Sequence, residues 1–126
     1  AALAAADLAV GRAGASTLAE AAAFALPTAI VPYPHAAGHQ RLNAEAFADA
    51  GAAILIEDEA FDADRLVEVA GPLADPARHA VMSAAAREIA RPDAAVAVAD
   101  LVLAVARRVA LPTEAEIETV ARGSRP

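Results

Sequence analysis

The sequence predicts an α/β fold in which a small parallel β-sheet is covered by helices on both faces. Three short apolar runs, at residues 8–10, 28–31 and 52–56, alternate with longer segments of helical character. Short apolar runs bounded by turn residues are typical of buried strands, and their alternation with helices indicates βαβ units. Because such sheets usually have more than three strands, we expect further strands of the domain to lie outside this sequence.

The first strand leads into a loop over residues 11–14 that begins and ends with glycine. We predict a helix from Ser16 or Thr17 to Ala25, because apolar residues recur there at helical spacing. Pro27 follows directly and ends this helix, since proline is common just beyond a helix C-terminus.

The second strand, residues 28–31, is followed by Pro32 and Pro34, which stiffen the exit from the strand. The next predicted helix covers residues 39–50. Gly51 stands where a left-handed residue commonly ends a helix, and the third strand begins directly after it.

The rest of the chain is predicted to be helical, with breaks at Asp75–Pro76 and at Arg91–Pro92. Proline is favoured at the first position of a helix, so each pair indicates a break and a new start. The predicted helices are residues 62–73, 76–90 and 92–109. Residues 110–126 carry scattered charges and are expected to form a frayed helix and a C-terminal tail.

Composition excludes several classes of function. The formal net charge is −7 and the ten cationic residues, all arginines, form no cluster, which argues against nucleic acid and anionic lipid surfaces as partners. There is no cysteine for a disulfide or a zinc thiolate site. No apolar run is long enough for a transmembrane helix. His35 and His39 have no third ligand nearby in the sequence, so no metal site is predicted.

The helix that follows the first loop is a candidate anion site. Glycines at 11 and 14 would let the backbone turn sharply and approach a ligand closely. The amides of residues 15–18 and the Thr17 hydroxyl would then point at that ligand, and a diphosphate suits a helix N-terminus. Glu20, one turn further, could accept two hydrogen bonds from a vicinal diol such as a ribose.

The same residues also fit a purely structural role. Thr17 and Glu20 have the spacing of a capping box, in which Thr17 caps the helix and Glu20 bonds back to the amide of the capping residue. Arg12 is equally ambiguous, since it could pair with a phosphate or form a surface salt bridge. The spacing alone leaves both alternatives open.

The second candidate loop follows the second strand. Gln40 and Asn43 are three residues apart and therefore share one face of the predicted helix. With His39, they offer donors and acceptors suited to sugar hydroxyls, although polar residues are also commonplace at the start of a surface helix. No pair of nucleophile and base is discernible anywhere in the sequence.

In this order and at these spacings, the motifs resemble the MurG-type N-acetylglucosaminyltransferases of glycosyltransferase family 28. The resemblance covers residues 1–109. It is carried by residues 6–8, 12–20, 26–32, 38–44, 50–53 and 91–95. Ser16 departs from the family pattern, in which a larger apolar residue is frequent.

The resemblance implies a Rossmann-like domain within a two-domain GT-B fold. Residues 1–109 would be part of the C-terminal, donor-binding domain, and residues 110–126 a tail. The residues that it assigns to UDP-GlcNAc binding are Ala15, Ser16, Thr17, Leu18, Ala19, Glu20, Gln40 and Asn43. The first five would hold the diphosphate through their backbone and the threonine hydroxyl, the glutamate would bind the ribose, and the last two would contact the GlcNAc.

The implied reaction is an inverting transfer of GlcNAc onto undecaprenyl-pyrophosphoryl-MurNAc-pentapeptide, which forms lipid II for peptidoglycan at the cytoplasmic face of the bacterial plasma membrane. No cofactor is implied, because a helix dipole can stabilise the departing diphosphate. The acceptor site, the general base and a peripheral membrane contact are expected in an N-terminal domain outside this sequence, so that this chain alone would hold no catalytic residue and be inactive. Two alternatives remain: a nucleotide-sugar-binding subunit that needs a separate partner chain, and a related GT-B-like enzyme, such as a sugar-nucleotide epimerase, with another acceptor.

Overall fold

The computed structural model describes residues 2–35 and 38–123. The chain divides into two compact units, Ala1–Ala90 and Arg91–Pro126. This division lies inside the segment expected as one donor-binding domain, residues 1–109.

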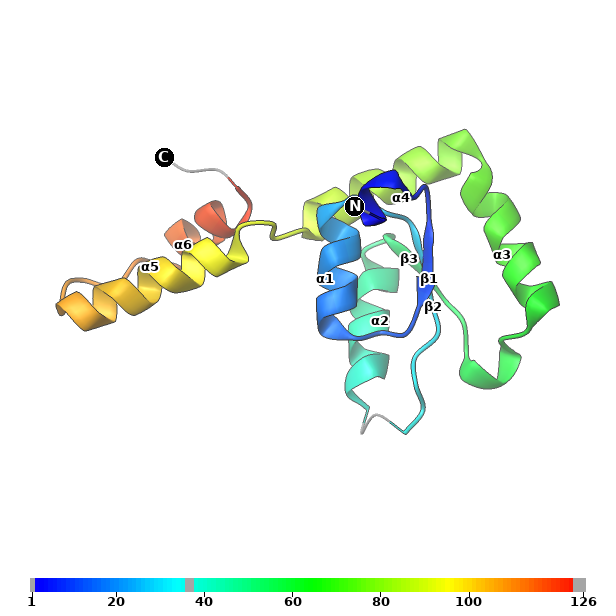
Figure 1. The fold of residues 1–126 in the computed structure, drawn as a ribbon, viewed down its shortest axis with the longest axis horizontal. Helices are drawn as coiled ribbons and strands as arrows, with labels where there is room; N and C mark the ends of the chain where they lie inside the picture. The colour runs from blue at the N-terminus through cyan, green and yellow to red at the C-terminus, as the bar shows by residue number, and fades with distance from the viewer. Residues whose placement is uncertain (1, 36–37, 124–126) are drawn as a thin grey trace. The chain divides into compact units, whose positions relative to one another are not determined.

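The first unit is built from three strands and the helices that connect and follow them (Figure 1). Its strands are β1 (Ala9–Gly11), β2 (Thr28–Ile30) and β3 (Ala53–Leu55). Its α-helices are α1 (Ala15–Ala23), α2 (His39–Asp49), α3 (Ala63–Ala74) and α4 (Pro76–Ile89), with short 3-10 helices η1 (Leu3–Ala5) and η2 (Asp58–Ala60).

The sheet has the order β1-β2-β3, and both pairings are parallel. Gly11 pairs with Ile30, and Ile30 pairs with Leu55, so the carboxyl ends of the three strands lie side by side. This confirms the predicted parallel α/β architecture. β2 and β3 are shorter than predicted, since pairing stops where the chain turns into each exit loop, whereas β1 has the predicted length and begins one residue later.

Alternate residues of the central strand β2 face two separate apolar clusters. Ile30 packs with Leu18 of α1 and Ala44 of α2, whereas Ala29 packs in the second cluster with Leu73 of α3. Figure 1 shows α1 and α2 on one side of the sheet and α3 on the other. A parallel sheet covered on both faces buries its central strand, and all three residues of β2 are buried. The one polar side chain among them, Thr28, donates its hydroxyl proton to the Leu26 carbonyl at 3.0 Å.

Local signals fix the later helices as predicted. The Asp75 carboxylate accepts a hydrogen bond from the Arg78 amide at 2.9 Å, and Pro76 occupies the first turn of α4. Asp62 caps α3 in the same way. Gly51 has a φ of 78° after the end of α2, which confirms the predicted left-handed cap.

Several predicted boundaries are wrong for identifiable reasons. Helix α1 begins at Ala15, not at Ser16 or Thr17, because Gly14 is the capping residue. It ends at Ala23, not at Ala25, because Phe24 is its C-cap and Ala25 adopts a left-handed φ of 56°, so that the helix stops before Pro27. The helix predicted over residues 92–109 is shorter, since Arg108 adopts a left-handed φ of 54° and stops it.

The second unit consists of α5 (Ala94–Arg107) and α6 (Glu114–Ala121), which pack against each other. Helix α6 lies in the segment expected as a frayed helix and tail. It begins with a capping box formed by Thr113 and Glu116.

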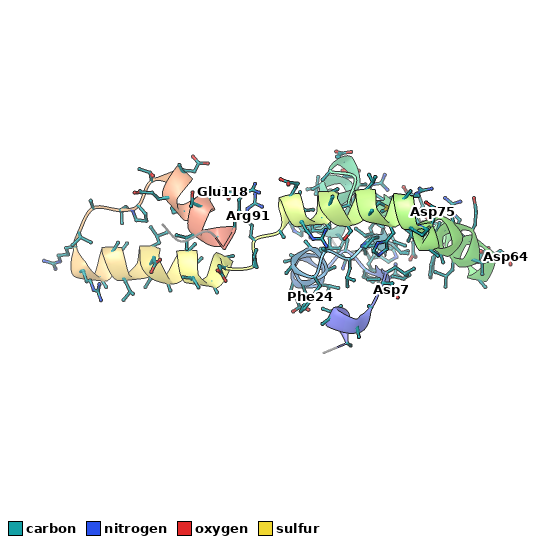
Figure 2. All side chains as sticks on the ribbon, turned by 90° about the horizontal axis from the view of Figure 1, so that it is seen from above. Asp7, Phe24, Asp64, Asp75, Arg91 and Glu118 are labelled. Atoms are coloured by element: carbon teal, nitrogen blue, oxygen red, sulfur yellow. The ribbon has the colours of Figure 1, made fainter. Side chains whose placement is uncertain are left out.

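The Arg91 guanidinium joins the two helices through the Glu118 carboxylate, with a distance of 2.9 Å between Nε and Oε2 (Figure 2). That hydrogen bond is the main cause that lowers the pKa of Glu118 below its ordinary value. In the part of the chain that the structure describes, no helix is both long and apolar enough to cross a membrane.

The fold predicts a large difference between two positions of α3. Leu73 is 1% exposed in the cluster on the α3 side of the sheet, whereas Val67 is 73% exposed. Leu73→Ala should lower the free energy of unfolding by about 2–5 kcal/mol, because it deletes buried methyl groups and leaves a cavity. Val67→Ala should change it by no more than about 0.5 kcal/mol. Urea unfolding measures both, and equal effects would contradict the assignment of the buried face.

Candidate functional site

The carboxyl edge of the sheet brings together the exits of all three strands. The chain leaves β1 into residues 12–14, β2 into residues 31–38 and β3 into residues 56–57 before η2 begins. Helices α1 and α2 both start at this edge, since each follows a parallel strand. Ligands of open α/β sheets bind at such an edge.

The first turn of α1 offers backbone amides at this edge. Leu18 donates its amide proton to the Gly14 carbonyl at 3.0 Å, and its side chain is buried in the core. The amides of Ala15, Ser16 and Thr17 lie before that first helical hydrogen bond, so the helix itself provides no acceptor for them. These three amides are therefore the backbone donors that the helix presents.

The capping-box alternative for this helix is wrong. Thr17 is the third helical residue and not the cap, which is Gly14, and no side chain caps the helix. Both the Thr17 and Glu20 side chains are exposed. Within residues 2–35 and 38–123, none of the recorded hydrogen bonds uses the hydroxyl or the carboxylate of this pair. They share one face of α1 at a spacing of three residues.

The glycines of the first loop are not there for an unusual backbone. Gly14 has a φ of −68°, which every residue adopts, and Gly11 has no positive φ either. The chain nevertheless passes from β1 into α1 within residues 12–14, with no positive φ in that turn. A Cβ at Gly14 would lie 3.7 Å from Thr17 Oγ1, in ordinary contact, and a Cβ at Gly11 would meet open space.

Three residues in the first turns of α2 each reach a different strand exit. Gln40 Oε1 accepts a hydrogen bond from the Tyr33 amide after β2 at 2.9 Å. Asn43 Nδ2 donates to the Ala13 carbonyl after β1 at 3.1 Å. Arg41 pairs with Glu57 after β3, at 2.6 Å between nitrogen and carboxylate oxygen.

These bonds use only part of each amide side chain. In the hydrogen bonds recorded for the described residues, the Nε2 amino group of Gln40 and the Oδ1 oxygen of Asn43 do not take part. A donor and an acceptor consequently remain at the start of α2, as a sugar with several hydroxyls would need.

Two charged residues after β3, Glu57 and Asp58, also lie at this edge. The sequence patterns had not indicated them. Arg41 bonds to Glu45 at 2.7 Å and to Glu57, and these hydrogen bonds raise the pKa of its guanidinium above the ordinary value. Arg12 forms an ion pair with Asp58, which is the surface salt bridge left open above. The run of acidic residues directly after the third strand could have indicated them, because the ends of parallel strands lie at one edge of the sheet.

A cavity of about 230 Å³ lies at this edge. It is lined by Tyr33, Pro34 and Gly38 between β2 and α2, by Arg41, and by Glu57 and Asp58 after β3. Both charged and apolar side chains line the cavity, and it adjoins the helix that carries both amide candidates. Residues 36 and 37, which belong to the second candidate loop, lie outside the described residues.

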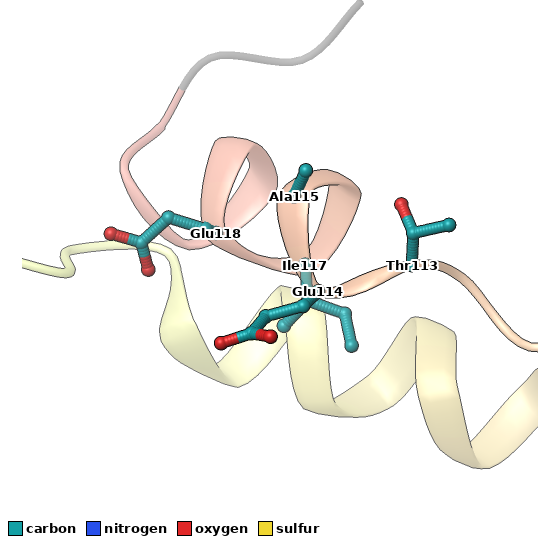
Figure 3. Close-up of a pocket in the computed structure, with 5 residues that line it drawn as sticks. All are labelled: Thr113, Glu114, Ala115, Ile117 and Glu118. Atoms are coloured by element: carbon teal, nitrogen blue, oxygen red, sulfur yellow. The ribbon is translucent and has the colours of Figure 1, made fainter.

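A wider depression in the second unit lies along α6 (Figure 3). It measures about 780 Å³ and is lined by Thr113, Glu114, Ala115, Ile117 and Glu118. Of its polar groups, Thr113 belongs to the capping box and Glu118 forms ion pairs with arginines. Among the described residues, no group of three or more His, Asp or Glu side chains is arranged to hold a metal ion.

Residues 1–101 match the model of the glycosyltransferase family 28 C-terminal domain. The chain is also similar to proteins named UDP-N-acetylglucosamine–N-acetylmuramyl-(pentapeptide) pyrophosphoryl-undecaprenol N-acetylglucosamine transferase. Identity is 48% over 108 residues for the protein of Chlorobium phaeobacteroides, which covers 84% of this chain and 30% of that protein. Identity is 48% over 106 residues for the protein of Mycobacterium tuberculosis H37Rv, which covers 83% of this chain and 26% of that protein. Identity is 47% over 104 residues for the protein of Moorella thermoacetica, which covers 81% of this chain and 28% of that protein. The chain thus spans less than a third of the length of these curated relatives.

The site predicts opposite effects for two glycine substitutions. Gly38 precedes α2 with a φ of 81°, so Gly38→Ala should lower the free energy of unfolding by about 1–2 kcal/mol. Gly11 ends β1 without a positive φ, and a Cβ there would meet open space. Gly11→Ala should raise stability by about 0.5–1 kcal/mol, because alanine loses less backbone entropy on folding. Denaturant unfolding of the two variants checks this, and changes of the same sign would be incompatible with it.

Proposed function

Because the chain belongs to the glycosyltransferase family 28 C-terminal domain family, we propose that it is the donor-binding part of a MurG-type transferase. The donor is UDP-GlcNAc, and the acceptor is the lipid-linked MurNAc-pentapeptide that the names of the relatives specify. The observation that carries the proposal is the first turn of α1, whose amides and Thr17 hydroxyl face the same edge of the sheet as the polar start of α2.

The diphosphate is assigned to the N-terminus of α1. Three amides without a helical acceptor and the positive end of the helix dipole favour a negative charge there. Gly14, the capping residue, has no side chain that could cover these amides, which leaves them accessible to a ligand.

The ribose and the sugar are assigned to side chains on either side of the diphosphate. The Glu20 carboxylate, one turn into α1, accepts hydrogen bonds from the ribose diol. Gln40 Nε2 donates to a hydroxyl of GlcNAc and Asn43 Oδ1 accepts from one, while their other atoms hold the strand exits. Ser16 contributes through its backbone, so its side-chain type matters little.

The chemistry proposed for this edge is stabilisation of a leaving group. When the acceptor hydroxyl attacks the anomeric carbon of GlcNAc with inversion, negative charge builds up on the departing UDP diphosphate. Fixed backbone dipoles aimed at that charge lower the barrier without having to reorganise. The general base and the acceptor site are assigned to the part of the longer protein that this chain does not span.

The proposed donor-binding domain extends to residue 109, because the family match reaches residue 101 within α5. Residues 110–126 form its C-terminal segment. Since the acceptor named for the relatives is an undecaprenol lipid, we place the whole enzyme peripherally at the cytoplasmic face of the bacterial plasma membrane, in peptidoglycan synthesis.

The diphosphate, more than the uridine or the sugar, should supply the binding energy. UDP should bind this chain at least about tenfold more tightly than uridine or free GlcNAc, because charge-assisted hydrogen bonds are the strong ones. Isothermal titration calorimetry measures the three affinities. Amide NMR shifts of Ser16 and Thr17 on addition of UDP locate the site. Equal affinities for UDP and uridine would refute the diphosphate assignment.

Replacement of Glu20 tests the ribose assignment. Glu20→Gln should leave the melting temperature unchanged, because this exposed carboxylate caps nothing. It should weaken UDP-GlcNAc binding about tenfold or more, since each charge-assisted hydrogen bond contributes roughly 1.5–3 kcal/mol. The loss should be much smaller for a 2′,3′-dideoxy-UDP analogue, which lacks the diol.

The matched control for this experiment is Asp64→Asn, which removes an exposed carboxylate near the start of α3 (Figure 2). This control should change neither the affinity for UDP-GlcNAc nor the affinity for the dideoxy analogue. If Glu20→Gln leaves UDP-GlcNAc binding intact, the glutamate has no role toward the ribose.

A further inference from the structure

Contacts at the carboxyl edge form a closed ring that joins both candidate loops. The Arg12 guanidinium carbon lies 5.5 Å from the centre of the Tyr33 ring. The Tyr33 amide donates to Gln40 Oε1 at 2.9 Å. Asn43, on the next turn of α2, donates to the carbonyl of Ala13 at 3.1 Å, directly beside Arg12 in the chain. A displacement of the arginine is therefore transmitted to the amide side chains of α2.

The same arginine contacts the exits of all three strands. Arg12 itself follows β1, and its Nη1 lies 3.3 Å from the Val31 carbonyl oxygen and 3.4 Å from that of Pro32, both after β2. It forms an ion pair with Asp58 of η2, after β3. Since each strand has only three residues, the ladder itself holds these exits weakly.

The Arg12–Asp58 pair is too exposed to matter much for stability. The side chains are 49% and 31% exposed, and ion pairs in such surroundings contribute little to folding. Its geometric effect is larger, because the one nitrogen Nη1 meets both the Asp58 carboxylate and two carbonyl groups after β2. Asp58 thus holds the guanidinium beside the Tyr33 ring, next to the backbone that carries the amide bonded to Gln40.

We propose that Arg12 and Asp58 are a positioning pair for the sugar end of the donor, acting through Tyr33 on Gln40. This inference rests on the proposed function, which assigns Gln40 to the GlcNAc. The pair leaves the diphosphate site largely unaffected, because the amides of α1 are fixed by their own helix. The pair thus determines how well the site distinguishes UDP-GlcNAc from UDP.

The test compares Asp58→Ala with Glu59→Ala, since both remove one negative charge from η2. Glu59 takes part in none of the ion pairs formed by the described residues. Asp58→Ala should weaken UDP-GlcNAc binding about three- to tenfold and leave UDP binding unchanged. It should also shift the NMR signals of the Gln40 side-chain amide and the Tyr33 backbone amide without any ligand. Glu59→Ala should do neither.

Several outcomes would overturn the positioning role. If Asp58→Ala tightens UDP binding, Arg12 is itself a diphosphate ligand that Asp58 withholds. If Asp58→Ala weakens the binding of UDP and of UDP-GlcNAc equally, or if the NMR signals of Gln40 and Tyr33 do not shift, the pair does not position Gln40. The double variant Arg12→Asp, Asp58→Arg, which keeps an opposite-charge pair, should restore part of the UDP-GlcNAc affinity.

Failure of the proposed function gives a different result. In that case the unaltered chain binds neither UDP nor UDP-GlcNAc, while the ligand-free NMR comparison still decides whether Asp58 positions Gln40. Should Asp58→Ala fail to fold, as judged by circular dichroism, Asp58→Asn takes its place, because it keeps the shape and removes the charge.

Discussion

Parallel pairing of three short strands is the constraint on which the rest of this structure depends. Because the strands run in the same direction and in register, everything that follows them in sequence meets at one edge. Both faces of the sheet are covered by helices, so this edge is where polar side chains and free helix N-termini gather. The arrangement of the backbone is therefore enough to bring the candidate binding groups to one edge.

Backbone amides can attract an anion even though the composition gives the protein a negative net charge. The chain has a formal net charge of −7 and no lysine, yet the proposed ligand carries a diphosphate. A helix N-terminus attracts an anion through its amides and dipole and requires no net positive charge. Arg12 could have provided such a charge, but Asp58 already pairs with it. The anion site that we propose is thus independent of the overall charge of the protein.

The amide side chains of α2 support the fold and keep polar atoms at the candidate site. Gln40 and Asn43 each hold a strand exit with one atom, and each retains its other polar atom at the same edge. A primary amide can do this because it carries an acceptor and two donors at opposite ends. The role that we propose for these two residues toward a ligand is therefore compatible with their role in the fold.

The sequence by itself determined the order of elements, because apolar runs, prolines and glycines act within a few residues. Gly51 and the Asp75–Pro76 pair ended and began helices where these local signals indicate. The cap of α1 was not determined in this way, since Thr17 with its glutamate has a capping spacing that the backbone does not use. The partners at the edge were decided only by tertiary structure. Arg12 meets Asp58 across 46 residues, and Asn43 meets Ala13 across 30. Such contacts depend on where the strands bring their exits, which no local pattern records.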